Sequence, residues 1–138
     1  MPREKSCGAV VFRKDPDGLP QYLLLNYGGH WDFVKGQVEP HESEKETALR
    51  ELSEETGISH FQLIQGFKKT ISYYYRRGDR TVYKEVVYFL VQAQESSVKL
   101  SYEHVGYAWL GYERAMKKLT FKNAQNVLNK AHSFLKRP

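Results

Sequence analysis

The chain has 138 residues, which suits one compact domain with its own hydrophobic core and is too short for two ordinary domains. Apolar residues make up 41% and aromatic residues 14% of the composition, more than a disordered chain contains, and the formal net charge is +5. The single cysteine, Cys7, excludes an internal disulfide, no apolar run is long enough for a membrane span, and residues 1–6 lack the apolar core of a secretory signal. We therefore expect residues 1–138 to form one soluble, cytoplasmic and monomeric domain.

The spacing of apolar and turn-forming residues predicts short strands interrupted by three helices. Turn signals at 15–18 and 77–80 predict two hairpins. Strands and helices mix without regular βαβ alternation, which indicates an α+β fold with a mixed sheet packed between helices. In chain order the prediction is strand 5–13, strand 21–27, strand 31–34, loop 35–42, helix 43–56, strand 61–75 with a bend at Gly66, strand 81–94, strand 105–110, and helices 111–118 and 121–135.

The helix at 43–56 has the clearest local signals. Ser43 followed by Glu46 fits a capping box, in which each side chain satisfies an orphan backbone donor at the start of a helix. Ala48 and Leu52 form an apolar stripe that predicts an inward face. Gly57 then ends the helix, since glycine adopts the left-handed cap conformation without strain.

Three acidic residues of this helix, Glu51, Glu54 and Glu55, are spaced so that their side chains share one face. Their like charges repel one another and lie at the unfavourable end of the helix dipole. A hard divalent cation such as magnesium would compensate, because it prefers oxygen ligands. An ordinary charged surface helix is the alternative, and the triplet by itself does not distinguish the two.

The surrounding residues resolve this ambiguity through a family resemblance. Gly36, Glu42 and residues 50–58, RELSEETGI, together resemble the Nudix box at every defining position. The resemblance implies a hydrolase that cleaves a diphosphate linkage with Mg²⁺ or Mn²⁺ held by a loop–helix–loop. It also implies an α/β/α sandwich with a mixed sheet between helices.

The resemblance also implies roles for individual residues. Glu51, Glu54 and Glu55 would be metal ligands, Glu51 would also be a candidate base for the attacking water, and Gly36 would offer its backbone carbonyl to a metal. Arg50 would orient Glu51, and Glu42 would support the structure of the box. Many family members use a further glutamate outside the box, for which Glu103 is our candidate, with an ordinary loop acid as the alternative.

The rest of the chain resembles the asymmetric diadenosine tetraphosphate hydrolases. Residues 31–40, 66–68 and 101–111 carry this likeness, whereas Val34 stands where that group has proline and His41 where it has glycine. The resemblance implies a dinucleoside polyphosphate substrate that is cleaved to ATP and AMP.

A tetraphosphate chain needs cations beyond the metal, and an adenine needs an aromatic face. Between residues 68 and 84 six bases stand against one acid. Strand alternation would point Tyr73 and Tyr75 to one face and Tyr74 to the other, although each tyrosine could equally be an ordinary half-buried strand residue. The candidate substrate-binding residues are the cations Lys35 and Lys84, helped by the 76–80 turn, the aromatic residues Tyr73, Tyr75 and Phe121, and His30 near the phosphates.

Two other functions remain open at this point. The box fits equally an RNA 5′-pyrophosphohydrolase or a hydrolase of nucleoside triphosphates or ADP-ribose, and a basic chain is compatible with RNA. A non-catalytic Nudix module that senses a nucleotide or binds RNA belongs to another class, and it predicts the loss of box carboxylates. Every box carboxylate is present in this chain.

Overall fold

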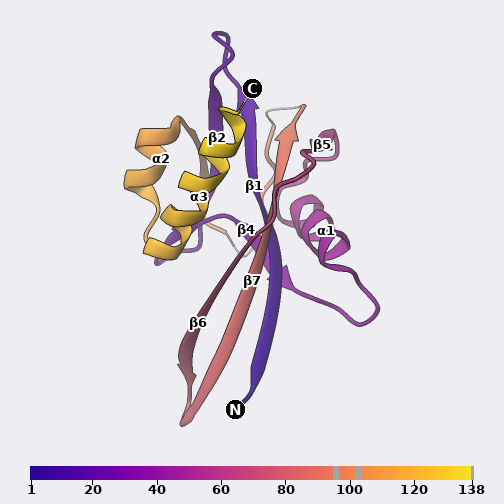
Figure 1. Cartoon of the computed structure of the whole chain (residues 1–138), viewed down its shortest axis with the longest axis vertical. Coiled ribbons are helices and arrows are strands. Elements are labelled where there is room, and N and C mark those ends of the chain that lie inside the picture. The colour runs from indigo at the N-terminus through magenta and orange to yellow at the C-terminus, as the bar shows by residue number, and fades with distance from the viewer. Residues whose placement is uncertain (95–96, 102–103, 138) are drawn as a thin grey trace.

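A computed structural model describes residues 1–94, 97–101 and 104–137 (Figure 1). A sheet occupies the middle of the molecule, with one helix on one side and two helices on the other (Figure 1). The elements are β1 (Arg3–Lys14), β2 (Pro20–Asn26), β3 (Trp31–Asp32), β4 (Val34–Gln37), α1 (Glu44–Thr56), β5 (Phe61–Leu63), β6 (Lys69–Arg77), β7 (Arg80–Ala93), β8 (Gly106–Leu110), α2 (Tyr112–Lys118) and α3 (Lys122–Leu135).

The sheet is mixed because its two longest strands run in the same direction. β1 pairs with β7 in parallel along almost its whole length, from Arg3 opposite Tyr83 to Phe12 opposite Gln92. The main strand order is β3-β2-β1-β7-β5, and in addition β8 pairs with β2, β6 with β7 and β4 with β1. Every pair except β1 with β7 is antiparallel. The predicted α+β class with a mixed sheet between helices is confirmed.

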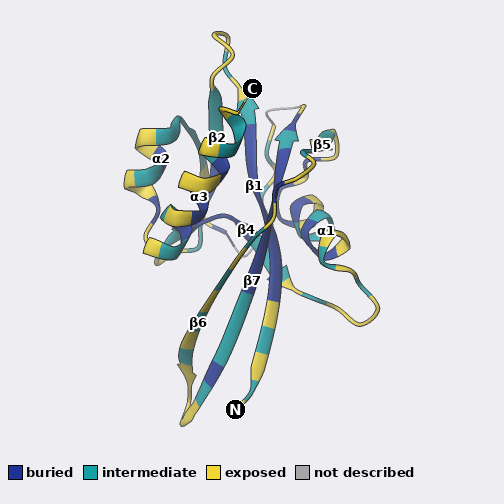
Figure 2. Ribbon diagram, viewed as in Figure 1, coloured by how far each residue is buried: buried dark blue, intermediate teal, exposed yellow. Residues whose placement is uncertain are grey.

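Successive side chains of the central strands point to opposite faces of the sheet and contribute to two separate hydrophobic cores. Val10 and Phe12 of β1 pack on the side of α2 and α3, whereas Ala9 and Val11 pack on the side of α1. Both layers are closed by helices, so the middle of β1 and β7 is buried on both faces (Figure 2). A strand covered on both faces loses the alternation of apolar and polar residues, which explains the continuous apolar run in this segment.

The local signals for α1 are confirmed. Ser43 accepts a hydrogen bond from the Glu46 amide at 3.1 Å, and the Glu46 side chain accepts one from the Ser43 amide at 2.8 Å. Gly57 has φ of 72° and closes the helix in the left-handed conformation. Leu52 and Ala48 are fully buried, so the inward stripe holds the helix against the sheet.

Two element predictions are wrong. Residues 35–37, predicted as loop, belong to strand β4 (Val34–Gln37), and the strand predicted at 31–34 is divided between β3 and β4. The pairing depends on Gly8 of β1, where a Cβ atom would lie 2.1 Å from the Val34 carbonyl oxygen. The single strand predicted at 61–75 is two strands, β5 and β6, whereas its predicted bend is confirmed, since Gly66 adopts φ of 93° between them.

In the part of the chain that the structure describes, no helix has the length and apolar character needed to cross a bilayer.

We predict that Ser43→Ala lowers the free energy of unfolding by about 1 kcal/mol, because it removes the side-chain half of the capping box. Thermal melting should show a decrease of roughly 3 °C. Ser133→Ala is the matched control, since Ser133 is exposed within α3 and caps neither end. Equal melting temperatures for Ser43→Ala and wild type would contradict the prediction.

Candidate active site

The guanidinium of Arg50 in α1 is the centre of the box. Its Nε and Nη2 donate to the two carboxylate oxygens of Glu42 at 2.5 and 3.1 Å, and Nη2 also donates to the Gln37 carbonyl at 3.0 Å. Its Nη1 donates to Glu51 at 2.9 Å and to Glu54 at 3.1 Å. One cation therefore joins α1 to the loop before it and to the end of β4.

These contacts shift the ionisation of both partners. The hydrogen bonds from Arg50, followed by that from the Glu39 amide, lower the pKa of Glu42 to about 2. The Glu42 carboxylate in turn raises the pKa of Arg50 above its ordinary value, with a further contribution from Glu51. Both groups are therefore fully charged at neutral pH, and Glu42 holds the box together as the sequence predicts.

Glu51, Glu54 and Glu55 of α1 line one pocket of about 510 Å³. Their environments differ, because Glu54 is exposed, Glu51 is partly buried and Glu55 is buried. Arg50 compensates the charges of Glu51 and Glu54, because its Nη1 donates a hydrogen bond to each of the two carboxylates. The residues that line this pocket are Lys35, Gly36, Gln37, Glu51, Glu54, Glu55 and Ser101.

Gly36 meets the helix at the Glu51 carboxylate. A Cβ atom on residue 36 would lie 2.0 Å from Glu51 Oε1 and 2.1 Å from its Cδ, which no side chain could tolerate without displacing the carboxylate. Glycine at this position therefore leaves the space that the Glu51 carboxylate occupies. The predicted role of the Gly36 carbonyl as a metal ligand remains a prediction.

Glu55 lies at the buried end of the pocket, beside a histidine that the sequence analysis did not select. His104 Nε2 is 3.3 Å from Glu55 Oε1, and its Nδ1 is 3.1 Å from Ser101 Oγ. Tyr27 packs edge-on against the His104 ring at 4.5 Å. The predicted additional glutamate, Glu103, lies outside the described residues.

A second pocket of about 670 Å³, a size typical of small-molecule sites, lies on the other face of the sheet beside the start of α3. All six candidate substrate-binding residues line it: His30, Lys35, Tyr73, Tyr75, Lys84 and Phe121. The structure thus brings together side chains from five separate segments of the chain. Their roles in binding remain predictions.

The predicted alternation of the tyrosines is confirmed. The Tyr73 and Tyr75 rings lie 6.3 Å apart on the pocket side of β6, whereas Tyr74 is 64% exposed and contacts Tyr83 on the opposite face. Across the pocket, His30 stacks parallel to Tyr27 at 5.0 Å and contacts Phe121 at 5.1 Å. Aromatic side chains therefore stand on both sides of the space.

Lys35 borders both pockets, so the two spaces meet at its side chain. Its ammonium group is held by Asp32 at 2.8 Å, and Asp32 is buried, with its other oxygen accepting from the Phe33 amide at 2.7 Å. Burial lowers the pKa of Lys84, and the positive charges of Lys35 and Arg77 lower it further. The sequence analysis did not select Asp32, although a buried carboxylate almost always has a charged partner, which here is the Lys35 ammonium group.

The donor set fits a hard divalent cation, because three carboxylates and a backbone segment without a side chain face one polar pocket. The carboxylates are not gathered at ligand distance in this arrangement. Among the described residues no three acidic, histidine or cysteine side chains form such a cluster. Glu51 and Glu54 contact Arg50 instead, so a cation would take over charge that Arg50 now compensates.

Comparison with known proteins agrees with this geometry. A family model described as the NUDIX domain matches residues 3–130. The chain belongs to the NUDIX family. As a member it is a pyrophosphohydrolase that acts on acid anhydrides, and the family generally works with divalent metal ions.

Relatives within the family are similar over nearly the whole chain. The asymmetrical bis(5′-nucleosyl)-tetraphosphatase of Mus musculus is 38% identical over 143 residues, covering 95% of each chain. The crystal structure of a Caenorhabditis elegans Ap4A hydrolase binary complex matches with a TM-score of 0.84 and 30% identity, covering 96% of this chain and 97% of that one. The mRNA-decapping protein g5R of African swine fever virus is 30% identical over 121 residues, covering 77% of this chain and 48% of the viral one.

One departure from the subfamily pattern has a structural consequence. His41 has φ of 68°, in the left-handed region that glycine adopts without strain. His41 keeps this turn at a cost of about 1 kcal/mol relative to glycine.

We predict that Gly36→Ala lowers kcat/KM by about 10²-fold, because the new methyl group displaces the Glu51 carboxylate by an ångström or more. Steady-state kinetics measure the effect. Gly106→Ala is the control, since its Cβ would make an ordinary 3.9 Å contact with Asn26. Unchanged kinetics for Gly36→Ala would mean that the position of Glu51 does not matter.

We predict that Glu42→Gln destabilises the protein at neutral pH and that the difference disappears in acid. The folded-state pKa of Glu42 is about 2 and its ordinary value is 4.5, so the unfolded chain takes up the proton first as the pH falls. The stabilisation is complete above pH 4.5 and is lost towards pH 2.

Urea unfolding of both proteins over this pH range, with EDTA present, measures the difference. Glu113→Gln in α2 is the control, because Glu113 is exposed. A stability difference between wild type and Glu42→Gln that persisted unchanged in acid would rule out the ion pair as its source.

Proposed function

We propose that this protein hydrolyses diadenosine tetraphosphate asymmetrically, to ATP and AMP, with Mg²⁺ or Mn²⁺ as its cofactor. The observation that supports this most directly is the meeting of two pockets at Lys35, one lined by carboxylates and one by aromatic residues and lysines. A nucleoside with a long phosphate chain needs both spaces. The similarity to asymmetrical tetraphosphatases over 95% of the chain points to the same substrate.

Each pocket has a distinct part in the proposed reaction. Tyr73 and Tyr75 on one side and Phe121 with His30 on the other would hold a nucleobase. Lys84 and Lys35 would contact the phosphates and lead the chain towards the carboxylates. The lowered pKa of Lys84 reflects burial, and an arriving phosphate would restore the preference for its charged form.

Glu51, Glu54 and Glu55 would hold the metal in the second pocket. The chemistry that a divalent cation would supply there is neutralisation of phosphate charge and a lower pKa for bound water. Glu51, fixed by Arg50 on one side and by the backbone of Gly36 on the other, would accept the proton of the attacking water. His104 would keep the Glu55 carboxylate in place at the buried end.

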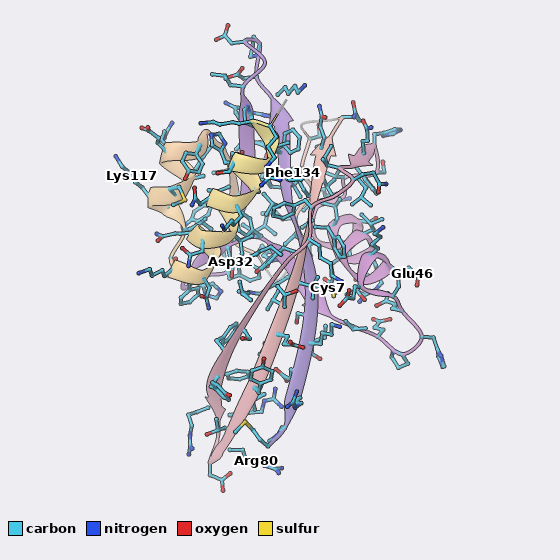
Figure 3. The ribbon with its side chains drawn as sticks, in the orientation of Figure 1. Cys7, Asp32, Glu46, Arg80, Lys117 and Phe134 are labelled. Atoms are coloured by element: carbon cyan, nitrogen blue, oxygen red, sulfur yellow. The ribbon has the colours of Figure 1, made fainter. Side chains whose placement is uncertain are left out.

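We also propose that residues 1–138 form one catalytic domain that acts as a monomer in the cytoplasm. Cys7 is buried beside α1, and burial raises its pKa to about 11, so the thiol is unreactive (Figure 3). A lone buried thiol suits a reducing compartment. Gel filtration of the enzyme measures its oligomeric state.

A substrate panel with Mg²⁺ and with Mn²⁺ tests the proposed substrate. We predict that diadenosine tetraphosphate is cleaved with a higher kcat/KM than 5′-triphosphorylated RNA or ADP-ribose, and that chromatography resolves ATP and AMP. Water labelled with heavy oxygen shows which phosphorus is attacked. Two molecules of ADP as products would contradict the asymmetric assignment.

We predict that Glu51→Gln lowers kcat by about 10²-fold or more, because it removes both a metal ligand and the candidate base. Glu113→Gln on α2 is the matched control, with the same chemical change outside both pockets. Metal affinity measured by calorimetry accompanies the kinetics. Full activity of Glu51→Gln would place the catalytic centre elsewhere.

A second candidate substrate is the 5′ end of RNA. The similarity to a viral mRNA-decapping protein over 77% of the chain favours it, together with the excess of basic residues near the aromatic pocket. Preference for triphosphorylated RNA in the same panel would support this candidate. Absence of any hydrolysis would favour a non-catalytic binding module.

A further inference from the structure

The strands β1, β7 and β6 extend together beyond the body of the molecule as a ribbon (Figure 1). We define the ribbon as residues 3–5, 69–77 and 80–85. Its front face carries Tyr73, Tyr75 and Lys84 into the aromatic pocket. Its back face is the opposite one, on the side of α1, and the proposed function assigns nothing to it.

Three side chains lie in one row across the back face. The strand register places Arg3 of β1 beside Tyr83 of β7, and Tyr83 beside Tyr74 of β6. The Arg3 guanidinium lies 5.2 Å from the centre of the Tyr83 ring, and the Tyr83 and Tyr74 rings are 5.2 Å apart. Tyr74 is 64% exposed, so this row presents aromatic surface to solvent.

The ribbon is also strongly basic. Arg76 follows Tyr74 by two residues and therefore lies on the back face, where it donates to Thr81 at 3.2 Å. Arg80 is at the far tip of the ribbon (Figure 3). In the ribbon and its turn at 78–79, seven bases stand against three acids: the bases are Arg3, Lys5, Lys69, Arg76, Arg77, Arg80 and Lys84, and the acids are Glu4, Asp79 and Glu85.

We propose that the back face of this ribbon binds single-stranded nucleic acid. The exposed Tyr74 ring and the half-buried Tyr83 ring on an open sheet offer stacking surfaces for unpaired bases, and arginines beside them pair with phosphates. A duplex would hide its bases from the rings. This site is independent of the active-site pockets, since alternation along β6 separates Tyr74 from Tyr73 and Tyr75.

Fluorescence anisotropy of a short labelled oligouridylate with a 5′-hydroxyl end, in EDTA and at low salt, tests the proposal without hydrolysis. We expect the double variant with Tyr74→Ala and Tyr83→Ala to bind the oligonucleotide about tenfold more weakly than wild type, since stacking is largely lost. Tyr74→Phe keeps the ring and should bind like wild type. Tyr107→Ala is the matched control, because Tyr107 is an exposed tyrosine of β8 at the other edge of the sheet.

Further arms separate stacking from charge. Arg3→Gln should reduce the slope of log affinity against log salt by about 1. An excess of ATP, which enters the aromatic pocket, should not displace the oligonucleotide. Single-stranded DNA should bind as RNA does, and duplexes more weakly. Hydrolysis by Tyr74→Ala should equal that of wild type, and melting curves check that each variant folds.

Several results would overturn the proposal. They are no binding at low salt, equal losses in Tyr107→Ala and in the double variant, no loss in the double variant, or displacement by ATP. Each of these outcomes leaves the hydrolytic function untouched, so the two proposals fail separately.

Discussion

The ion pair between Arg50 and Glu42 is the interaction on which the site depends. Its bidentate geometry fixes the guanidinium plane, and the remaining N–H groups then donate hydrogen bonds to Glu51, Glu54 and the Gln37 carbonyl. Without this cation, three carboxylates on one helical turn would repel one another at the unfavourable end of the helix dipole. Because Glu42 belongs to the loop and Gln37 to β4, the same group that compensates charge also joins the three segments of the box.

Strand β4 contributes residues both to the pocket lined by carboxylates and to the pocket lined by aromatic residues. It lies close to β1 because Gly8 carries no side chain, and alternation along it separates neighbours. Gly36 faces α1 and leaves space for the Glu51 carboxylate, whereas Lys35 contacts Asp32 and borders the aromatic pocket. Two adjacent residues thereby serve different pockets, and Lys35 borders both of them.

The same alternation operates on β6. Tyr73 and Tyr75 line the pocket, and Tyr74 belongs to the exposed row with Tyr83 and Arg3. Since β6 and β7 extend beyond the helices, neither face of their far ends is covered by a helix (Figure 1). Inside the body a strand has to bury both faces, as the middle of β1 does, and can offer no such surface.

The sequence by itself determined α1 with its cap and its stop, the strand periodicities and the spacing of the box, because these depend on residues within a few positions of one another. It also indicated which tyrosines share a face. The tertiary structure decided the rest. Residues 35–37 looked like a loop because Lys35 and Gly36 are poor strand formers, and only pairing with β1 makes them part of a strand. Asp32 and His104 acquire their meaning from Lys35 and Glu55, and the contact of Glu55 with His104 spans far more sequence than any local pattern can encode.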